Sequence, residues 1–118
     1  MGQIIRCCGS LFVDIDGTLL HRSTEEPLPF AVEKLNAAYD KGYMIVLTTM
    51  RGGDSKVSGG DNYPQIPSHL TVKQLKEIGL KYHAIIWNCP SPRIVMNDEG
   101  AIAYNHPADG SWERYVFL

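Results

Sequence analysis

Short, continuous apolar runs alternate along the chain with segments in which apolar residues recur at helical spacing. Continuous runs of this length are typical of strands buried on both faces of a parallel sheet. Four such strands are predicted, over 10–14, 43–48, 83–87 and 93–96. The tail, 101–118, is expected to add one or two short edge strands.

Two helices are predicted between these strands. From Phe30 to Lys41 the apolar side chains recur at helical spacing, and Gly42 follows as a C-cap. The second helix is expected to open at Thr71, with Gln74 as its capping-box partner, and to end at Gly79.

Strands that alternate with helices predict an α/β fold, a Rossmann-like three-layer sandwich with a central parallel sheet covered on both faces. The 118 residues fit one domain, 1–118. Right-handed crossovers bring the C-terminal ends of parallel strands to one edge, where ligands bind. We expect the polar residues at the predicted strand ends to converge there: Asp14, Asp16, Thr48, Thr49, Asn97 and Asp98.

Composition and charge narrow the functional classes. The net charge is −2 without a long run of either sign, which argues against nucleic-acid and membrane binding through a clustered basic face. No apolar stretch approaches the roughly 20 residues that cross a bilayer, and the N-terminal segment lacks the apolar core of a signal peptide. The three cysteines, an odd number, are typical of reduced thiols, so a cytoplasmic location is expected.

The acidic residues at the strand ends suggest chemistry on phosphate. Asp14, Asp16 and Asp98 would form an oxygen-rich cluster of the kind that holds Mg²⁺. One carboxylate of such a cluster can act as a nucleophile, and a second can protonate the leaving oxygen and later activate water. Thr48 or Thr49 offers a hydroxyl to a phosphate oxygen, and Arg51 adds a planar pair of donors.

Three segments carry a resemblance to a known family. Residues 11–19, LFVDIDGTL, resemble the first motif of the haloacid dehalogenase superfamily, an apolar strand followed by DxDGT. Residues 45–51, IVLTTMR, resemble its second motif, and residues 94–98, IVMND, resemble its fourth. The resemblance covers residues 10–100, and the Arg-Gly after the second motif is similar to small capsule- or sugar-related hydrolases of that superfamily.

The resemblance implies roles for the strand-end residues. Asp14 would be the nucleophile and Asp16 the general acid and base. Magnesium would be held by Asp14, the backbone carbonyl of Asp16 and Asp98, with Asn97 as a further candidate ligand. Thr49 would bind the phosphate, with Thr48 as the alternative.

The chain departs from the family pattern at the third motif, which supplies a lysine. Cys89 stands at the equivalent position and brings no positive charge. We expect another cation to compensate, Arg51 or Arg93, with Lys73 as a weaker candidate. The fourth motif also carries Asn97 in place of a second aspartate, which removes one negative charge from the site.

Too few residues lie between Thr18 and the first helix for the cap domain that most members of the superfamily carry. A glycine-rich loop, 51–68, would act at most as a small flap. An open site favours a large substrate, or a homo-oligomer in which a neighbouring subunit covers it. The prediction is a magnesium-dependent phosphomonoester hydrolase with an aspartyl-phosphate intermediate, acting on a small phosphorylated substrate such as a sugar phosphate. The alternative is a catalytically weak member that binds a phosphorylated ligand or a protein partner.

Overall fold

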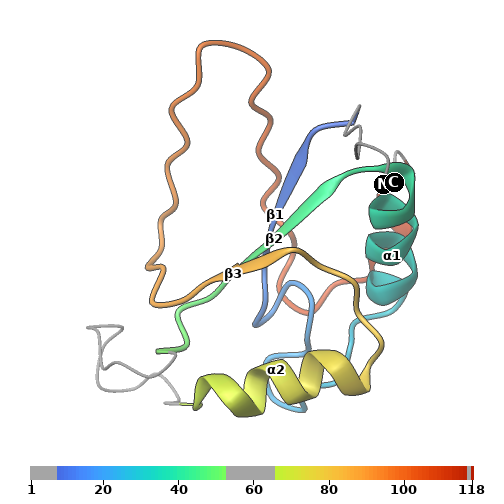
Figure 1. Ribbon diagram of the computed structural model, residues 1–118, viewed down its shortest axis with the longest axis vertical. Helices are drawn as coiled ribbons and strands as arrows, with labels where there is room; N and C mark the ends of the chain where they lie inside the picture. Colours follow the sequence, from blue (N-terminus) through green and yellow to red (C-terminus); the bar gives the residue numbers. More distant parts are fainter. Residues whose placement is uncertain (1–7, 53–65, 117) are drawn as a thin grey trace, which may run out of the picture.

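The computed structural model describes residues 8–52, 66–116 and 118. They form a small α/β fold with a three-stranded parallel sheet and two α-helices (Figure 1). The elements are β1 (Ser10–Asp14), α1 (Ala31–Lys41), β2 (Met44–Thr48), α2 (Ser68–Glu77), β3 (Ala84–Ile86) and a short 3-10 helix, η1 (Trp112–Arg114). The α/β class and the first three predicted strands are confirmed. The glycine-rich loop lies mostly outside the described residues. No helix of the described part is long and apolar enough to cross a membrane.

The sheet has the order β1-β2-β3, and all its pairings are parallel. Asp14 lies opposite Thr48, and Thr48 lies opposite Ile86. The C-terminal ends of the three strands are therefore level, which places Asp14 at the edge where the sequence predicts a ligand site.

The two faces of the sheet differ in cover. Val13, Ile45 and Leu47 point into one apolar cluster that also contains Leu35 of α1 and Leu75 of α2. Side chains alternate across a strand, so Phe12 and Asp14 share the opposite face. Phe12 is 62% exposed there, whereas its partner Val46 on the same face is buried. This face is therefore open along β1, and the Asp14 side chain is partly exposed on it.

Helix α1 follows its prediction to within one residue. Gly42 adopts a left-handed conformation with φ 107°, and its N–H donates to the carbonyls of Ala38 and Tyr39. This is the glycine C-cap expected from the sequence, because glycine reaches positive φ without steric cost.

Helix α2 corrects one prediction. It begins at Ser68, so Thr71 lies inside the helix and does not open it. The side chains of Thr71 and Gln74, one turn apart on the same face, accept hydrogen bonds from Arg51. The three-residue spacing therefore lets both side chains bind the buried Arg51, and it does not form a capping box.

The predicted fourth strand, 93–96, is wrong. Among the described residues this segment belongs to a long loop that leaves the end of β3, extends away from the sheet and returns beside it (Figure 1). Its apolar side chains lie in solvent, Met96 being 92% exposed. The physical reason is at its start: Arg93 is bonded to Asp14 and to the Cys89 carbonyl, and the residues beyond find no strand to pair with.

The edge strands expected in the tail are also absent from its described residues. Instead, η1 packs Trp112 into the apolar cluster, and Tyr115 packs beside it. The Trp112 N–H donates to the Pro29 carbonyl, at 2.9 Å, and Lys34 Nζ donates to the Tyr115 carbonyl, also at 2.9 Å. Through these contacts the tail covers the apolar cluster next to α1.

Candidate active site

A tight turn follows β1 and carries both aspartates of the DxDGT sequence. The Ile15 N–H donates to the Thr48 carbonyl at 3.0 Å, which continues the β1–β2 pairing by one residue. The Ile15 carbonyl then accepts the N–H groups of Leu19 and Leu20, each at 2.9 Å. Gly17, at φ 84°, allows the reversal. The chain therefore folds back on itself immediately after Asp14.

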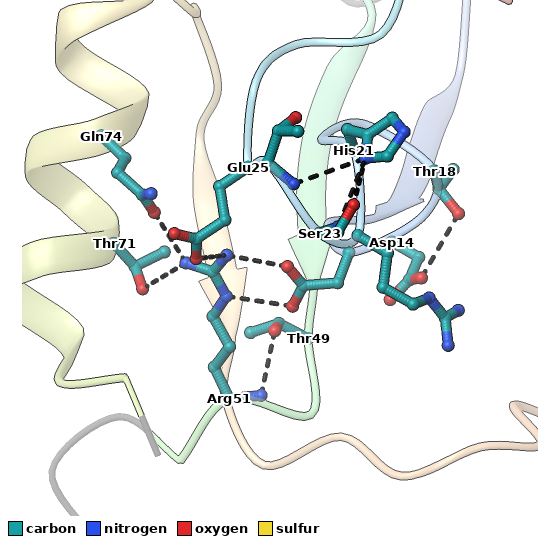
Figure 2. Close-up of polar contacts among 12 residues, drawn as sticks. Asp14, Thr18, His21, Ser23, Glu25, Thr49, Arg51, Thr71 and Gln74 are labelled. Atoms are coloured by element: carbon teal, nitrogen blue, oxygen red, sulfur yellow. Dashed lines mark hydrogen bonds and ion pairs between the residues drawn. The ribbon is translucent and has the colours of Figure 1, made fainter. Parts of the chain in front are cut away.

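The reversal brings Thr18 against Asp14. The Thr18 hydroxyl donates to Oδ2 of Asp14 at 3.3 Å (Figure 2). The turn is held from the tail as well, because the Asp109 N–H donates to the Gly17 carbonyl at 2.9 Å and Trp112 Nε1 donates to the Thr18 carbonyl. Asp14 is thus fixed by the strand before it and by the turn after it.

The Asp14 carboxyl has a raised pKa. Burial raises its pKa above the ordinary value, and the charge and hydrogen bonds of Arg93 and Thr18 offset this only in part. The nearby Asp16 charge raises it further. Its side chain is still 32% exposed, on the open face of the sheet. A partly desolvated carboxylate that solvent can reach is suited to act on a ligand.

Arg93 is the cation at Asp14. Its Nη1 lies 3.1 Å from Asp14 Oδ1, and its Nη2 donates to the Cys89 carbonyl at 2.6 Å. The Nε atom is buried and donates to no acceptor among the described residues. Of the two arginines that the sequence offers in place of the missing lysine, the structure puts Arg93 against Asp14. Lys73 instead lies 4.0 Å from Glu77 on α2.

Arg51 serves the other aspartate. Its guanidinium binds Asp16 through two parallel contacts, Nε to Oδ2 at 3.0 Å and Nη2 to Oδ1 at 2.7 Å. Nη1 donates to Thr71 at 2.9 Å and to Gln74 at 2.8 Å, and Nη2 lies 3.3 Å from Glu25. The Arg51 side chain is fully buried, with 0% exposure. The residue predicted to bind substrate is therefore an internal tie between β1, β2 and α2.

The two threonines after β2 are also buried. Thr49 is inaccessible to solvent, and its hydroxyl accepts the Arg51 N–H at 3.0 Å. Its N–H donates to the Ile86 carbonyl at 3.1 Å, and its carbonyl accepts the Cys89 N–H at 2.8 Å. Thr48 is buried at the end of β2, next to Asp14 in the register. Thr49 thus orders the strand ends, and Thr48 lies closer to the nucleophile candidate.

Asp98 and Asn97 lie on the exposed loop and not at a strand end. Asp98 Oδ1 accepts the Glu99 N–H at 2.9 Å, and the Asn97 amide donates to the Glu99 carbonyl. The structure does not bring them to Asp14 and Asp16 as the sequence predicts.

The described residues therefore do not fit the predicted magnesium site. Nowhere in that part of the chain do three or more histidine, cysteine or acidic side chains gather in a way that would hold a metal ion. Both oxygens of Asp16 accept from Arg51, and both oxygens of Asp14 have donors nearby. Among the described residues, the positive charge next to these two aspartates comes from Arg93 and Arg51.

Sequence reasoning missed three residues of this region. Thr18, in the DGT sequence, contacts the nucleophile candidate. Glu25 contacts the buried Arg51, and Arg22 lies against Gly17. The position of Arg22, just after the DxDGT turn, is a signal that a search for nearby cations would have found. The burial of Arg51 has no comparable signal, because its partners come from separate segments.

Comparison with known proteins identifies no relative of this chain. No protein-family model, curated protein or solved structure matches the chain. The resemblance to the haloacid dehalogenase superfamily rests on the sequence motifs alone, and the chemistry of the site rests on its geometry.

Proposed function

We propose that this chain is a phosphomonoester hydrolase whose nucleophile is the carboxylate of Asp14. One observation carries the proposal: Asp14 projects from the open face at the end of β1 with the guanidinium of Arg93 3.1 Å away. A nucleophilic carboxylate beside a cation is the minimum needed to receive a phosphate dianion, because phosphoryl transfer depends on positioning and charge neutralisation. A Rossmann-like sandwich of the haloacid dehalogenase type and a cytoplasmic location belong to the same proposal.

The proposed reaction has two steps. An oxygen of Asp14 bonds to phosphorus as the ester P–O bond breaks, and Asp16 gives a proton to the leaving oxygen. Water then attacks the aspartyl phosphate, giving one proton back to Asp16 and its hydroxyl to phosphorus. Inorganic phosphate leaves, and both side chains return to their starting protonation states.

Asp16 can serve as the acid in this scheme only if one of its two hydrogen bonds to Arg51 breaks when it is protonated. Each Asp16 oxygen accepts one guanidinium N–H, so an oxygen that takes a proton must release its donor. The contacts of Arg51 Nη1 to Thr71 and Gln74 do not involve Asp16, so they can hold the guanidinium in place during that change.

Magnesium is proposed as the cofactor on the strength of the acidic motif residues. The described residues do not assemble the predicted ligands, and no step above depends on the ion. A sugar phosphate as substrate, and a second subunit over the open face, are proposed from the sequence alone.

The test is hydrolysis of p-nitrophenyl phosphate by the full chain, with and without added Mg²⁺. We expect turnover by the unaltered protein, and none by Asp14→Asn, because an amide is a poor nucleophile. Asp40→Asn is the matched control, since Asp40 is an exposed carboxylate on α1 that pairs with Lys81. Acid quenching should trap a phosphorylated Asp14 in the unaltered chain. Wild-type turnover by Asp14→Asn would exclude Asp14 as the nucleophile.

A second function has an observation in its favour. Asp16 is held by a buried arginine, and no third acidic ligand joins the two aspartates in the described part of the chain. This arrangement suits a protein that binds a phosphorylated ligand, or a phosphorylated partner, without cleaving it. Saturable binding of inorganic phosphate with no turnover of p-nitrophenyl phosphate under any Mg²⁺ concentration would favour this function.

A further inference from the structure

Arg22 lies against the backbone of the turn that carries Asp14 and Asp16. A Cβ atom built on Gly17 would stand 3.0 Å from Nη2 of Arg22 and 3.2 Å from its Nε. The guanidinium therefore occupies the space that the missing side chain of Gly17 leaves. The backbone N–H of Arg22 donates to Asp109 Oδ1 at 2.8 Å, and Asp109 in turn donates its own N–H to the Gly17 carbonyl. The start of the Arg22 side chain is thus fixed to the turn.

Arg22 differs from the other two arginines of the site in its partners. Arg51 binds Asp16, and Arg93 binds Asp14. The guanidinium of Arg22 has no carboxylate within ion-pair distance among the described residues, and the residue is exposed. Its five N–H donors are consequently available to a ligand, in the planar arrangement that matches two phosphate oxygens.

The turn geometry puts this cation close to the nucleophile candidate. Because the chain reverses at Gly17, Thr18 returns to within 3.3 Å of Asp14. A guanidinium packed on Gly17 therefore lies on the turn that joins Asp14 and Asp16 to Thr18. An incoming dianion is repelled by Asp14 and Asp16, and Arg93 and Arg51 already neutralise those charges. A further cation beyond these two pairs strengthens the attraction for the dianion.

We infer that Arg22 binds the phosphoryl group of the ligand, the role that the sequence suggested for Arg51. This inference rests on the proposed function for its ligand class, a phosphate monoester or inorganic phosphate, but not on hydrolysis. Gly17 has a second purpose in this arrangement besides its positive φ: it leaves room for the guanidinium above the turn.

The experiment measures binding of inorganic phosphate to the full chain by isothermal titration calorimetry. We expect Arg22→Ala to weaken phosphate affinity about tenfold, the effect of losing one charge-assisted contact. Arg22→Lys should recover part of the affinity, because it restores the charge but not the planar donor pair. Lys81→Ala, which removes a positive charge beyond the opposite edge of the sheet, should change affinity less than twofold. Circular dichroism confirms that each variant is folded.

The p-nitrophenyl phosphate assay adds a second readout, in which Arg22→Ala raises KM more than it lowers kcat. Phosphate affinity of Arg22→Ala within twofold of the unaltered chain would overturn the inference, and so would an unaltered chain that binds no phosphate. Phosphate binding that depends on Arg22, in a chain without turnover, would support the inference and contradict only the hydrolase proposal.

Discussion

Asp14 and Asp16, two residues apart at the end of β1, each pair with an arginine from another segment. The two pairs differ in burial and in the number of their hydrogen bonds. The Arg51–Asp16 pair has a fully buried guanidinium, two parallel contacts and further acceptors on α2. The Arg93–Asp14 pair has one contact at 3.1 Å, and its side chains are 26% and 32% exposed. The first pair connects three elements of the fold, whereas the second faces the open side of the sheet.

The difference shows how one short motif can serve both structure and chemistry. A buried pair is costly to break, because the partner that remains is left charged and without solvent. A partly exposed pair contributes little stability, because water and salt screen it. Asp16 is therefore held in the framework, and the proton transfer proposed for it requires one oxygen to release Arg51, whereas the more exposed Asp14 can exchange its partner for a ligand.

The largest effect is expected from Arg51→Ala. Removing the guanidinium takes two charge-assisted contacts from the largely buried Asp16 carboxylate and a donor from both Thr71 and Gln74. We expect a loss of about 3–5 kcal/mol in the free energy of unfolding, the usual cost of breaking a buried pair. Urea denaturation measures it, with Lys81→Ala, which breaks an exposed pair, as the control. A loss below about 1 kcal/mol, typical of a surface pair, would contradict the assignment of Arg51 to the framework.

Arg93→Ala should separate stability from activity. The expected loss of unfolding free energy is about 1 kcal/mol or less, since the pair is partly exposed. By contrast, turnover of p-nitrophenyl phosphate should fall about tenfold or more, because a charge-assisted contact at the phosphate is lost. Arg93→Lys, which restores the charge, should recover part of the activity. If activity survives in Arg93→Ala, then Arg93 does not replace the lysine of the family pattern.

A smaller effect, of opposite sign, is expected from Asp14→Asn. The pKa of Asp14 is raised in the folded protein, so the folded state holds this proton more tightly than the unfolded state. Its contribution to stability is full below the unfolded pKa and is lost as pH rises through the folded pKa. At neutral pH the amide should therefore be more stable than the carboxylate. Urea unfolding at several pH values between 4 and 7 compares the two, and a less stable Asp14→Asn at pH 7 would contradict the prediction.

The smallest effect is expected from Asp98→Asn. Asp98 lies on the exposed loop, and among the described residues its carboxylate accepts only the N–H of the neighbouring Glu99. Stability should change by less than about 0.5 kcal/mol, as for other surface substitutions. The Mg²⁺ concentration that gives half-maximal turnover should also stay the same. A large rise in that concentration would instead show that Asp98 reaches the site when a ligand is bound, as the sequence motif predicts.

Local sequence patterns predicted the fold as far as β3. The strands 10–14 and 43–48 and the cap at Gly42 depend on neighbouring residues, and the structure confirms them. The pattern at 94–96 is equally apolar and gave the wrong element. Whether such a run is buried depends on a pairing partner, and here Arg93 is bound to Asp14, 79 residues away in the sequence. Periodicity contains no information about that contact.

The residues of the candidate site also separate into those that local sequence predicted and those that depend on tertiary contacts. The motif located Asp14 and Asp16 at a strand end, because a strand and a glycine turn are local features. It did not show that Arg51 would be buried, since that depends on acceptors from β1's turn and from α2. Nor did it show that Arg22 would lie over Gly17. Partners of charged side chains are set by tertiary packing, which one sequence does not disclose.

The contacts between the tail and the DxDGT turn have a consequence for the order of folding. Trp112 and Thr18 are 94 residues apart, and Arg22 and Asp109 are 87 apart. Closing loops of this length costs entropy before any contact repays it, and long-range contacts of this kind slow folding. The sheet and α1 are joined by much shorter connections, so they can assemble while the turn still lacks its supports. The nucleophile candidate is then set in its final geometry at a late stage, when the docking of the tail completes the structure around an already formed sheet.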